Sequence, residues 1–316
     1  MSYEELPQHA ARIQQLAIQE SLKQKGWTDI GHGELRAPTD VGEQGAKDIV
    51  AHTEQQFSGT AGMFTPFMTM PDPGGFDPML SDLGLAINAL SAGEGTTDPV
   101  SKLKVTANPA MEGMTTVSKN IQDWRGAAAT AFKQNFVEPF PAITANQFAL
   151  VATLNGAIEA EKALWDECRK NVDDVAHKAI KALEVMDECS PDEQVCLLTV
   201  ASSVFAVAAV LTTGGAAIAL TVAGAAAQAW SGTPRDDPPK VAFDGQTPQD
   251  ILKQVQDALN TLAEVTNAKE KLIADAMTSS AATLAANKSR FVSPRPALAD
   301  ATASTVTGPT GLGEAL

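Results

Sequence analysis

The sequence predicts an all-α protein: an elongated helical bundle with a Trp-x-Gly helix-turn-helix corner, a long coiled-coil-like helix pair and an apolar helical hairpin. Two observations favour helices over sheets. Aromatic residues make up only 5% of the 316 residues although 44% are hydrophobic, so small side chains, alanine above all, must let helices pack closely. Apolar residues also recur at spacings of three and four through most of the chain, which is the helical period.

The charge of the chain narrows its possible partners. A formal net charge of -15 at pH 7 leaves no basic face for a phosphate backbone, so we expect no nucleic-acid partner, and it repels most anionic membranes. The opening MSYEELPQHAARIQQLAIQE is amphipathic and acidic, unlike a signal peptide. We expect a protein that is cytoplasmic before export and reaches the exterior or the cell envelope by a signal-peptide-independent route.

Residues 1–75 are expected to form an N-terminal helix and an extended arm. The helix begins near Pro7, a residue favoured in the first turn, and ends at Gly26. Glycine and proline interrupt the rest of the segment, apart from one short helix over residues 44–57. We expect this arm to lie on the helical bundle of residues 76–290.

The bundle is expected to begin with a helix over residues 78–91. The stretch SAGEGTTDPV ends this helix, and Thr97 or Asp98 caps the next one. That second helix is interrupted near Pro109 and leads to Trp124.

A long helix follows. Pro139 and Pro141 must disturb the helix that starts at Ala127, because a proline ring removes a backbone hydrogen bond and clashes with the preceding turn. Beyond them an apolar stripe indicates a long helix that packs against a partner in coiled-coil fashion. The predicted packing residues are Val151, Leu154, Ile158, Trp165, Val172 and Val175. A second stripe in the helix over residues 248–289, capped by Thr247, supplies the partner.

The stretch from Val195 to Trp230 contains no charged residue and is expected to form a helical hairpin that turns at Gly214 and Gly215. Each arm is roughly 22–25 Å long at about 1.5 Å per residue, whereas a bilayer core measures about 30 Å. Length therefore favours a hairpin that stays buried or lies at an interface. The two alternatives are a hairpin that is sheltered in the soluble form and later inserts into a membrane, and a constitutive membrane span. The candidate residues for membrane contact in this hairpin are Val195, Phe205, Gly214, Gly215 and Trp230.

The sequence contains few candidates for catalytic, metal-binding or disulfide-forming residues. Cys189 and Cys196 flank SPDEQV and are either two semi-buried thiols or, in an oxidising compartment, a disulfide. His32 reads as part of a solvated turn, and His177 as a polar-face residue of the long helix. We expect no catalytic residue, no metal and no cofactor. The tail, residues 291–316, is rich in Ala, Thr, Pro and Gly and is expected to be disordered.

The stretch DWRGAAATAF marks the predicted corner. Gly126 can adopt the left-handed conformation that closes one helix, and the indole of Trp124 covers the junction. With Ala128 and Phe132, these residues resemble the signature of the WXG family of type VII (ESX) secretion substrates, including the longer PPE and EspB-like proteins of actinobacteria. The resemblance implies a WXG-like hairpin at about residues 99–187 and a secretion signal that includes Trp124 and Gly126.

The same resemblance implies a non-enzymatic protein that leaves the cell folded and binds a protein partner or itself. The second element of the family's signal, Tyr-x-x-x-Asp/Glu, does not follow the second helix, since Tyr3 is the one tyrosine. A partner chain could carry that element, or export could use another route. The alternative function is an α-helical pore-forming or membrane-inserting protein that uses the apolar hairpin of residues 195–230.

Overall fold

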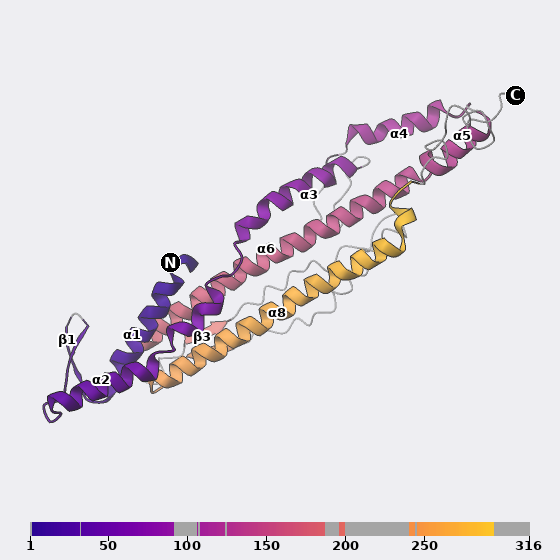
Figure 1. The fold of residues 1–316 in the computed structure, drawn as a ribbon. Helices are drawn as coiled ribbons and strands as arrows, with labels where there is room; N and C mark the ends of the chain where they lie inside the picture. The colour runs from indigo at the N-terminus through magenta and orange to yellow at the C-terminus, as the bar shows by residue number, and fades with distance from the viewer. Residues whose placement is uncertain are drawn as a thin grey trace. The chain divides into compact units, whose positions relative to one another are not determined.

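The computed structural model describes residues 2–31, 33–91, 106, 108–123, 125–186, 196–199, 240–243 and 245–293. These residues are mostly helical, which confirms the predicted all-α class (Figure 1). The chain divides into two compact units. The first unit comprises Met1–Pro73, Ala163–Val204 and Arg235–Lys269, and the second comprises Gly74–Lys162, Phe205–Pro234 and Glu270–Leu316.

The first unit opens with a short 3-10 turn, η1 (Tyr3–Glu5), and helix α1 (Leu6–Gln24). Pro7 lies in the first turn of α1, where its missing N–H costs no hydrogen bond. Residues at helical spacing form one fully buried face: Leu6, Ala10, Ile13 and Ala17. The helix ends just before Gly26, as the sequence predicts.

The next segment of the first unit is more structured than the expected extended arm. It contains a two-stranded antiparallel hairpin, the helix predicted at residues 44–57, and two 3-10 turns. The elements are β1 (Thr28–Gly31), β2 (Glu34–Arg36), α2 (Glu43–Phe57), η2 (Ala61–Phe67) and η3 (Pro73–Phe76), of which only Pro73 belongs to the first unit. Glycine and proline break a long helix but allow 3-10 turns. Here η2 buries Phe64 and Phe67, and Phe57, the last residue of α2, is buried as well.

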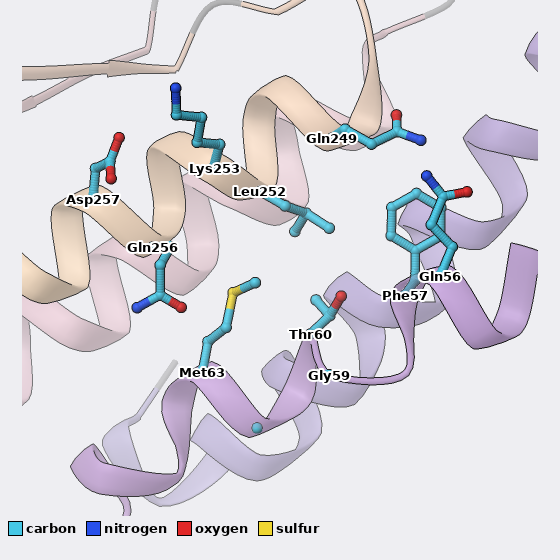
Figure 2. A pocket seen from close by; sticks show the side chains of 11 residues that line it. Gln56, Phe57, Gly59, Thr60, Met63, Gln249, Leu252, Lys253, Gln256 and Asp257 are labelled. Atoms are coloured by element: carbon cyan, nitrogen blue, oxygen red, sulfur yellow. The ribbon is translucent and has the colours of Figure 1, made fainter.

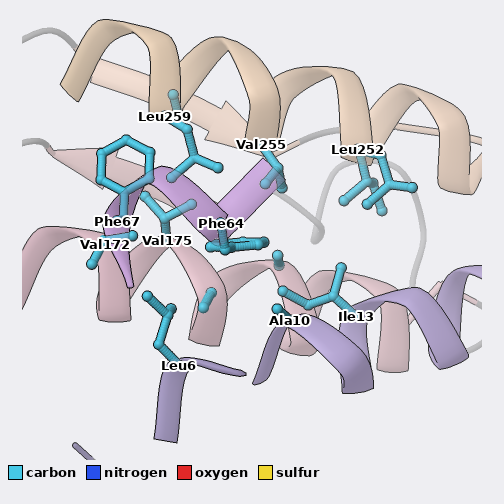
Figure 3. Close-up of a cluster of buried hydrophobic side chains, with 14 of the residues drawn as sticks. Leu6, Ala10, Ile13, Phe64, Phe67, Val172, Val175, Leu252, Val255 and Leu259 are labelled. Carbon is cyan, nitrogen blue, oxygen red and sulfur yellow. The ribbon is translucent and has the colours of Figure 1, made fainter. Parts of the chain in front are cut away.

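Two long helices complete the core of the first unit: α6 (Phe140–Glu184, 45 residues) and α8 (Pro248–Ala286, 39 residues). Phe64 is fully buried among side chains from α1, α6 and α8 (Figure 3). Other members of this core, drawn in the same figure, are Leu6, Ile13, Phe67, Val172, Val175, Leu252, Val255 and Leu259. The core thus joins segments far apart in the sequence.

A second pair of antiparallel strands lies in the first unit, β3 (Cys196–Thr199) and β4 (Lys240–Phe243). The start of the expected helical hairpin is therefore a strand, because periodicity alone does not distinguish a buried strand from a helix in an apolar run. The rest of that prediction lies outside the described residues, including Val195, Phe205, Gly214, Gly215 and Trp230.

The start of α8 follows the predicted cap. The backbone N–H of Asp250 donates to Oγ1 of Thr247 at 3.2 Å, and the N–H of Thr247 donates to Oδ2 of Asp250 at 3.2 Å. This reciprocal arrangement satisfies two backbone donors that a helix start leaves without partners. Pro248 occupies the first position of the helix.

The second unit holds the shorter helices and parts of both long ones. Its remaining elements are α3 (Asp77–Leu90), α4 (Pro109–Asn120), α5 (Ala127–Phe132), the π turn η4 (Lys133–Val137) and η6 (Lys288–Arg290). Ile87 of α3 packs against Phe148 and Ala152 of α6, and Lys162 of α6 pairs with Asp77. These two contacts make α3 antiparallel to α6.

The prolines act on the helix as the sequence predicts. The backbone N–H of Glu138 donates to the carbonyl of Lys133 at 2.9 Å, five residues earlier, so the chain forms a π turn before the prolines. Helix α6 begins between them, at Phe140, which places Pro141 in its first turn. Proline is tolerated there because the N–H it lacks would have no helical partner.

The predicted packing stripe of α6 is only partly the buried face. Val172 and Val175 are fully buried, and Trp165 packs against the core of the first unit. Val151 packs in the second unit and Ile158 is half-buried, but Leu154 is 37% exposed. Small and polar residues form the buried face there instead: Ala149, Ala152, Thr153, Asn155 and Ala157. A prediction based on the large apolar residues alone therefore places Leu154 on the buried face of α6, whereas its side chain is exposed.

Candidate functional site: the Trp-x-Gly corner

Two helices meet at the predicted corner in the second unit. Helix α4 ends at Asn120 and α5 begins at Ala127. Gly126, the residue before α5, has φ 105° and ψ 171°, a combination essentially confined to glycine. Its carbonyl accepts the first helical hydrogen bond, from Thr130 at 3.0 Å.

The conformation of Gly126 differs in one respect from the prediction. Its φ is positive, as expected, but its ψ is extended, so the residue does not close α4 in the left-handed helical conformation. Gly126 instead starts the second helix, because an N-cap residue needs an extended ψ. Trp124 lies outside the described residues, and its cover of the junction stays a prediction.

Side chains at and after the end of α5 stabilise the corner. Lys133 Nζ donates a hydrogen bond of 3.0 Å to the backbone carbonyl of Gln122 in the turn, which satisfies an acceptor beyond the end of α4. Phe132, Phe136 and Phe140 follow at intervals of four residues, with ring centroids 5.3 and 6.1 Å apart. The rings form one continuous aromatic row from α5 into α6.

Helix α3 presents apolar side chains to solvent in the second unit. Its one buried residue is Ile87, whereas Leu85 is 67% exposed and Met79 is 45% exposed. Single exposed apolar residues are normal on a protein surface. Leu85, the more exposed of the two, is therefore the candidate contact residue of this helix.

A hollow of about 620 Å³ lies in the first unit between the turn after α2 and the start of α8 (Figure 2). Its described lining is Gln56, Phe57, Gly59, Thr60, Gly62, Met63, Gln249, Leu252, Lys253, Gln256 and Asp257. Amide and hydroxyl groups there can hydrogen-bond a polar ligand. Its charged lining residues, Lys253 and Asp257, are both exposed, so this lining offers no desolvated acid–base pair.

A cluster of His9, Asp173 and His177 lies in the first unit, where α1 packs on α6. His9 Nδ1 lies 3.4 Å from Oδ1 of Asp173, and His177 Nδ1 lies 3.5 Å from Oδ2 of the same carboxylate. The two imidazole rings meet edge to face with centroids 4.5 Å apart. All three side chains are largely shielded from solvent, with 13%, 17% and 23% exposed for His9, Asp173 and His177.

Sequence reasoning missed this cluster. It placed His177 on the polar face of the long helix and assigned no role to His9 or Asp173. The available signal was the Asp-x-x-x-His spacing, because residues four apart lie on one helix face. Nothing in the sequence shows that His9, from the first helix, joins them.

Cys168 is buried in the first unit. Oγ1 of Thr266 donates to its Sγ at 3.4 Å, which joins α8 to α6. Burial lowers the pKa of nearby Lys269, while the carboxylate of Glu167 opposes that shift. Whether Cys189 and Cys196 are two thiols or a disulfide stays open, because Cys189 lies outside the described residues.

Among the described helices, none combines the length and the apolarity that crossing a membrane requires. Comparison with known proteins finds no matching family model, curated protein or solved structure. Function must therefore be inferred from the sequence and the local geometry.

Proposed function

We propose that this chain is a non-enzymatic helical interaction protein, exported as a WXG-like substrate of a type VII (ESX-like) secretion system. The observation that carries the proposal is the corner between α4 and α5. A tryptophan two residues before Gly126, a glycine-specific backbone and a helix that starts at once are the features that the family resemblance calls for.

The hydrogen bond that stabilises the corner supports its proposed role as a folded recognition element. Lys133 binds the carbonyl of Gln122, so the turn is tied to the second helix by a side chain as well as by the backbone. An export apparatus that selects folded substrates needs such a feature to keep its shape in the absence of a partner.

The exposed apolar side chains of α3 support the interaction role. Complete burial of a leucine or methionine side chain stabilises by about 1.5–3 kcal/mol, and Leu85 is 67% exposed before any partner binds. We propose that α3 contacts a partner protein or a second copy of this chain in the exported state.

Fractionation of the native host tests the proposal against its alternative. Culture supernatant, cytosol and carbonate-washed membrane are probed for the untagged chain, with a cytosolic enzyme as the lysis control. Soluble protein in the supernatant supports an exported interaction protein. Protein that resists the carbonate wash would instead favour the membrane-inserting function of residues 195–230.

A further inference from the structure

We propose that His9, Asp173 and His177 form a binding site for a divalent transition-metal ion of the zinc class. This site lies in the first unit and is independent of the corner on which the proposed export depends. One ring nitrogen of each histidine and one carboxylate oxygen lie within 4.8 Å of one another. Two imidazoles and a carboxylate suit Zn²⁺ and its neighbours better than Mg²⁺ or Ca²⁺, which prefer oxygen ligands.

The three side chains come from rigid elements. His9 lies in the first half of α1, and Asp173 and His177 lie one turn apart on α6. Their neighbours Ala10, Val172 and Ala176 are fully buried in the core of the first unit. A site built on packed helices holds its ligands in place before the ion arrives.

The separation of the ligand atoms fits a metal better than a direct hydrogen bond. Zinc bonds to nitrogen and oxygen measure about 2.0–2.2 Å, so two ligands at a tetrahedral angle lie about 3.4 Å apart. His9 Nδ1 and Asp173 Oδ1 are 3.4 Å apart. Both atoms are buried and neither has a hydrogen-bond partner.

Such a pair is costly as it stands. A buried polar atom that makes no hydrogen bond loses its hydration without a hydrogen bond in exchange. A cation between the two atoms would accept the lone pair of the imidazole nitrogen and neutralise the carboxylate oxygen. Both deficits would then be removed by one ion.

Two further groups lie beside the histidine ligands. When Nδ1 of His9 binds an ion, Nε2 carries the proton, and Oε2 of Glu5 faces Nε2 at 3.9 Å. Nδ1 of His177 donates to the backbone carbonyl of Asp173 at 2.8 Å. A carbonyl only accepts, so this bond fixes the orientation of the His177 ring.

Cobalt is the probe that tests the site, because tetrahedral Co²⁺ has strong visible absorption bands. Tag-free full-length protein is first treated with a chelator, then titrated with Co²⁺ and afterwards with Zn²⁺. We expect one Co²⁺ per chain, tetrahedral bands, and displacement by Zn²⁺. The substitutions His9→Gln, Asp173→Asn and His177→Gln should each weaken binding by about tenfold or more.

The matched control is His52→Gln, which changes an exposed histidine of α2 and should leave the titration unchanged. Circular dichroism checks that each variant remains folded, and three separate ligand variants guard against the loss of one. Absence of tetrahedral Co²⁺ bands in the unmodified protein would overturn the proposal. Equal Co²⁺ affinity in the unmodified protein and in folded His9→Gln and His177→Gln proteins would overturn it as well.

Discussion

Lys133 donates a hydrogen bond of 3.0 Å from its Nζ to the backbone carbonyl of Gln122. The bond crosses the corner, since Gln122 follows α4 and Lys133 follows α5. A cation near the carbonyl end of a helix also interacts favourably with the helix dipole. The corner is thus held by this side chain and by the backbone conformation of Gly126.

Gly126→Ala should destabilise the protein by about 1–3 kcal/mol, because φ 105° with ψ 171° is strained for any residue with a Cβ. Space is not the cause, since a Cβ at this position would meet no atom within 4 Å. Urea unfolding followed by circular dichroism measures the change in the free energy of unfolding.

Gly113→Ala is the matched control on the neighbouring helix α4. A Cβ there also meets no atom within 4 Å and Gly113 has no positive φ, so alanine should stabilise by about 0.5–1 kcal/mol. Equal effects of the two substitutions would show that the conformation of Gly126 is not what constrains the corner.

Phe64→Ala should cost about 3–5 kcal/mol, because Phe64 is fully buried in the core of the first unit. Leu85→Ala, at an exposed position of α3, should change the free energy of unfolding by no more than about 0.5 kcal/mol. Thermal and urea unfolding of both variants provide the measurement. A Phe64→Ala protein as stable as Leu85→Ala would mean that η2 does not pack into the core.

Leu85→Lys should weaken self-association or partner binding by about tenfold or more, which corresponds to about 1.4 kcal/mol. Lysine at this position would place a charge in the apolar contact that α3 is proposed to make. Sedimentation velocity over a concentration series measures self-association, and the same chain immobilised on a sensor measures binding of a co-exported partner.

Ile30→Lys is the control for that experiment, since Ile30 is 49% exposed on β1 in the first unit. It should leave association unchanged. Equal loss in both variants would point to a general effect of charge, and the assignment of the contact to α3 would fail.

Lys269→Met should change how stability depends on pH. Burial lowers the pKa of Lys269 below the ordinary value of 10.5, so the unfolded chain binds more protons just below pH 10.5. The contribution of Lys269 to the free energy of unfolding therefore increases as pH rises through that window. At lower pH the lysine is charged in both states, and the full cost of burying the charge remains. The Met variant should lose that gain, as urea unfolding between pH 8 and about 10.5 would show. An unchanged slope would contradict the effect of burial.

Local signals in the sequence predicted most of the helix boundaries. Pro7 and the Thr247–Asp250 pair marked helix starts, and Pro139 with Pro141 marked a break, because each acts on the backbone within one turn. Gly126 was likewise predicted to need a positive φ.

Features that depend on distant contacts were not predictable. The exposure of Leu154 follows from which face of α6 meets its neighbours, and the burial of Phe64 follows from the packing of four separate segments. The His9–Asp173–His177 cluster needs α1 to lie on α6 in one register. Periodicity identifies an apolar face but not the residues that will oppose it.

Export of a Trp124→Ala variant from the native host tests the proposed function most directly. Supernatant and cytosol are compared for the unmodified chain, Trp124→Ala, and the matched control Trp27→Ala in the first unit. We predict that Trp124→Ala disappears from the supernatant and accumulates, folded, in the cytosol, while Trp27→Ala is exported. Equal export of Trp124→Ala and the unmodified chain would contradict a WXG-like secretion signal at the corner.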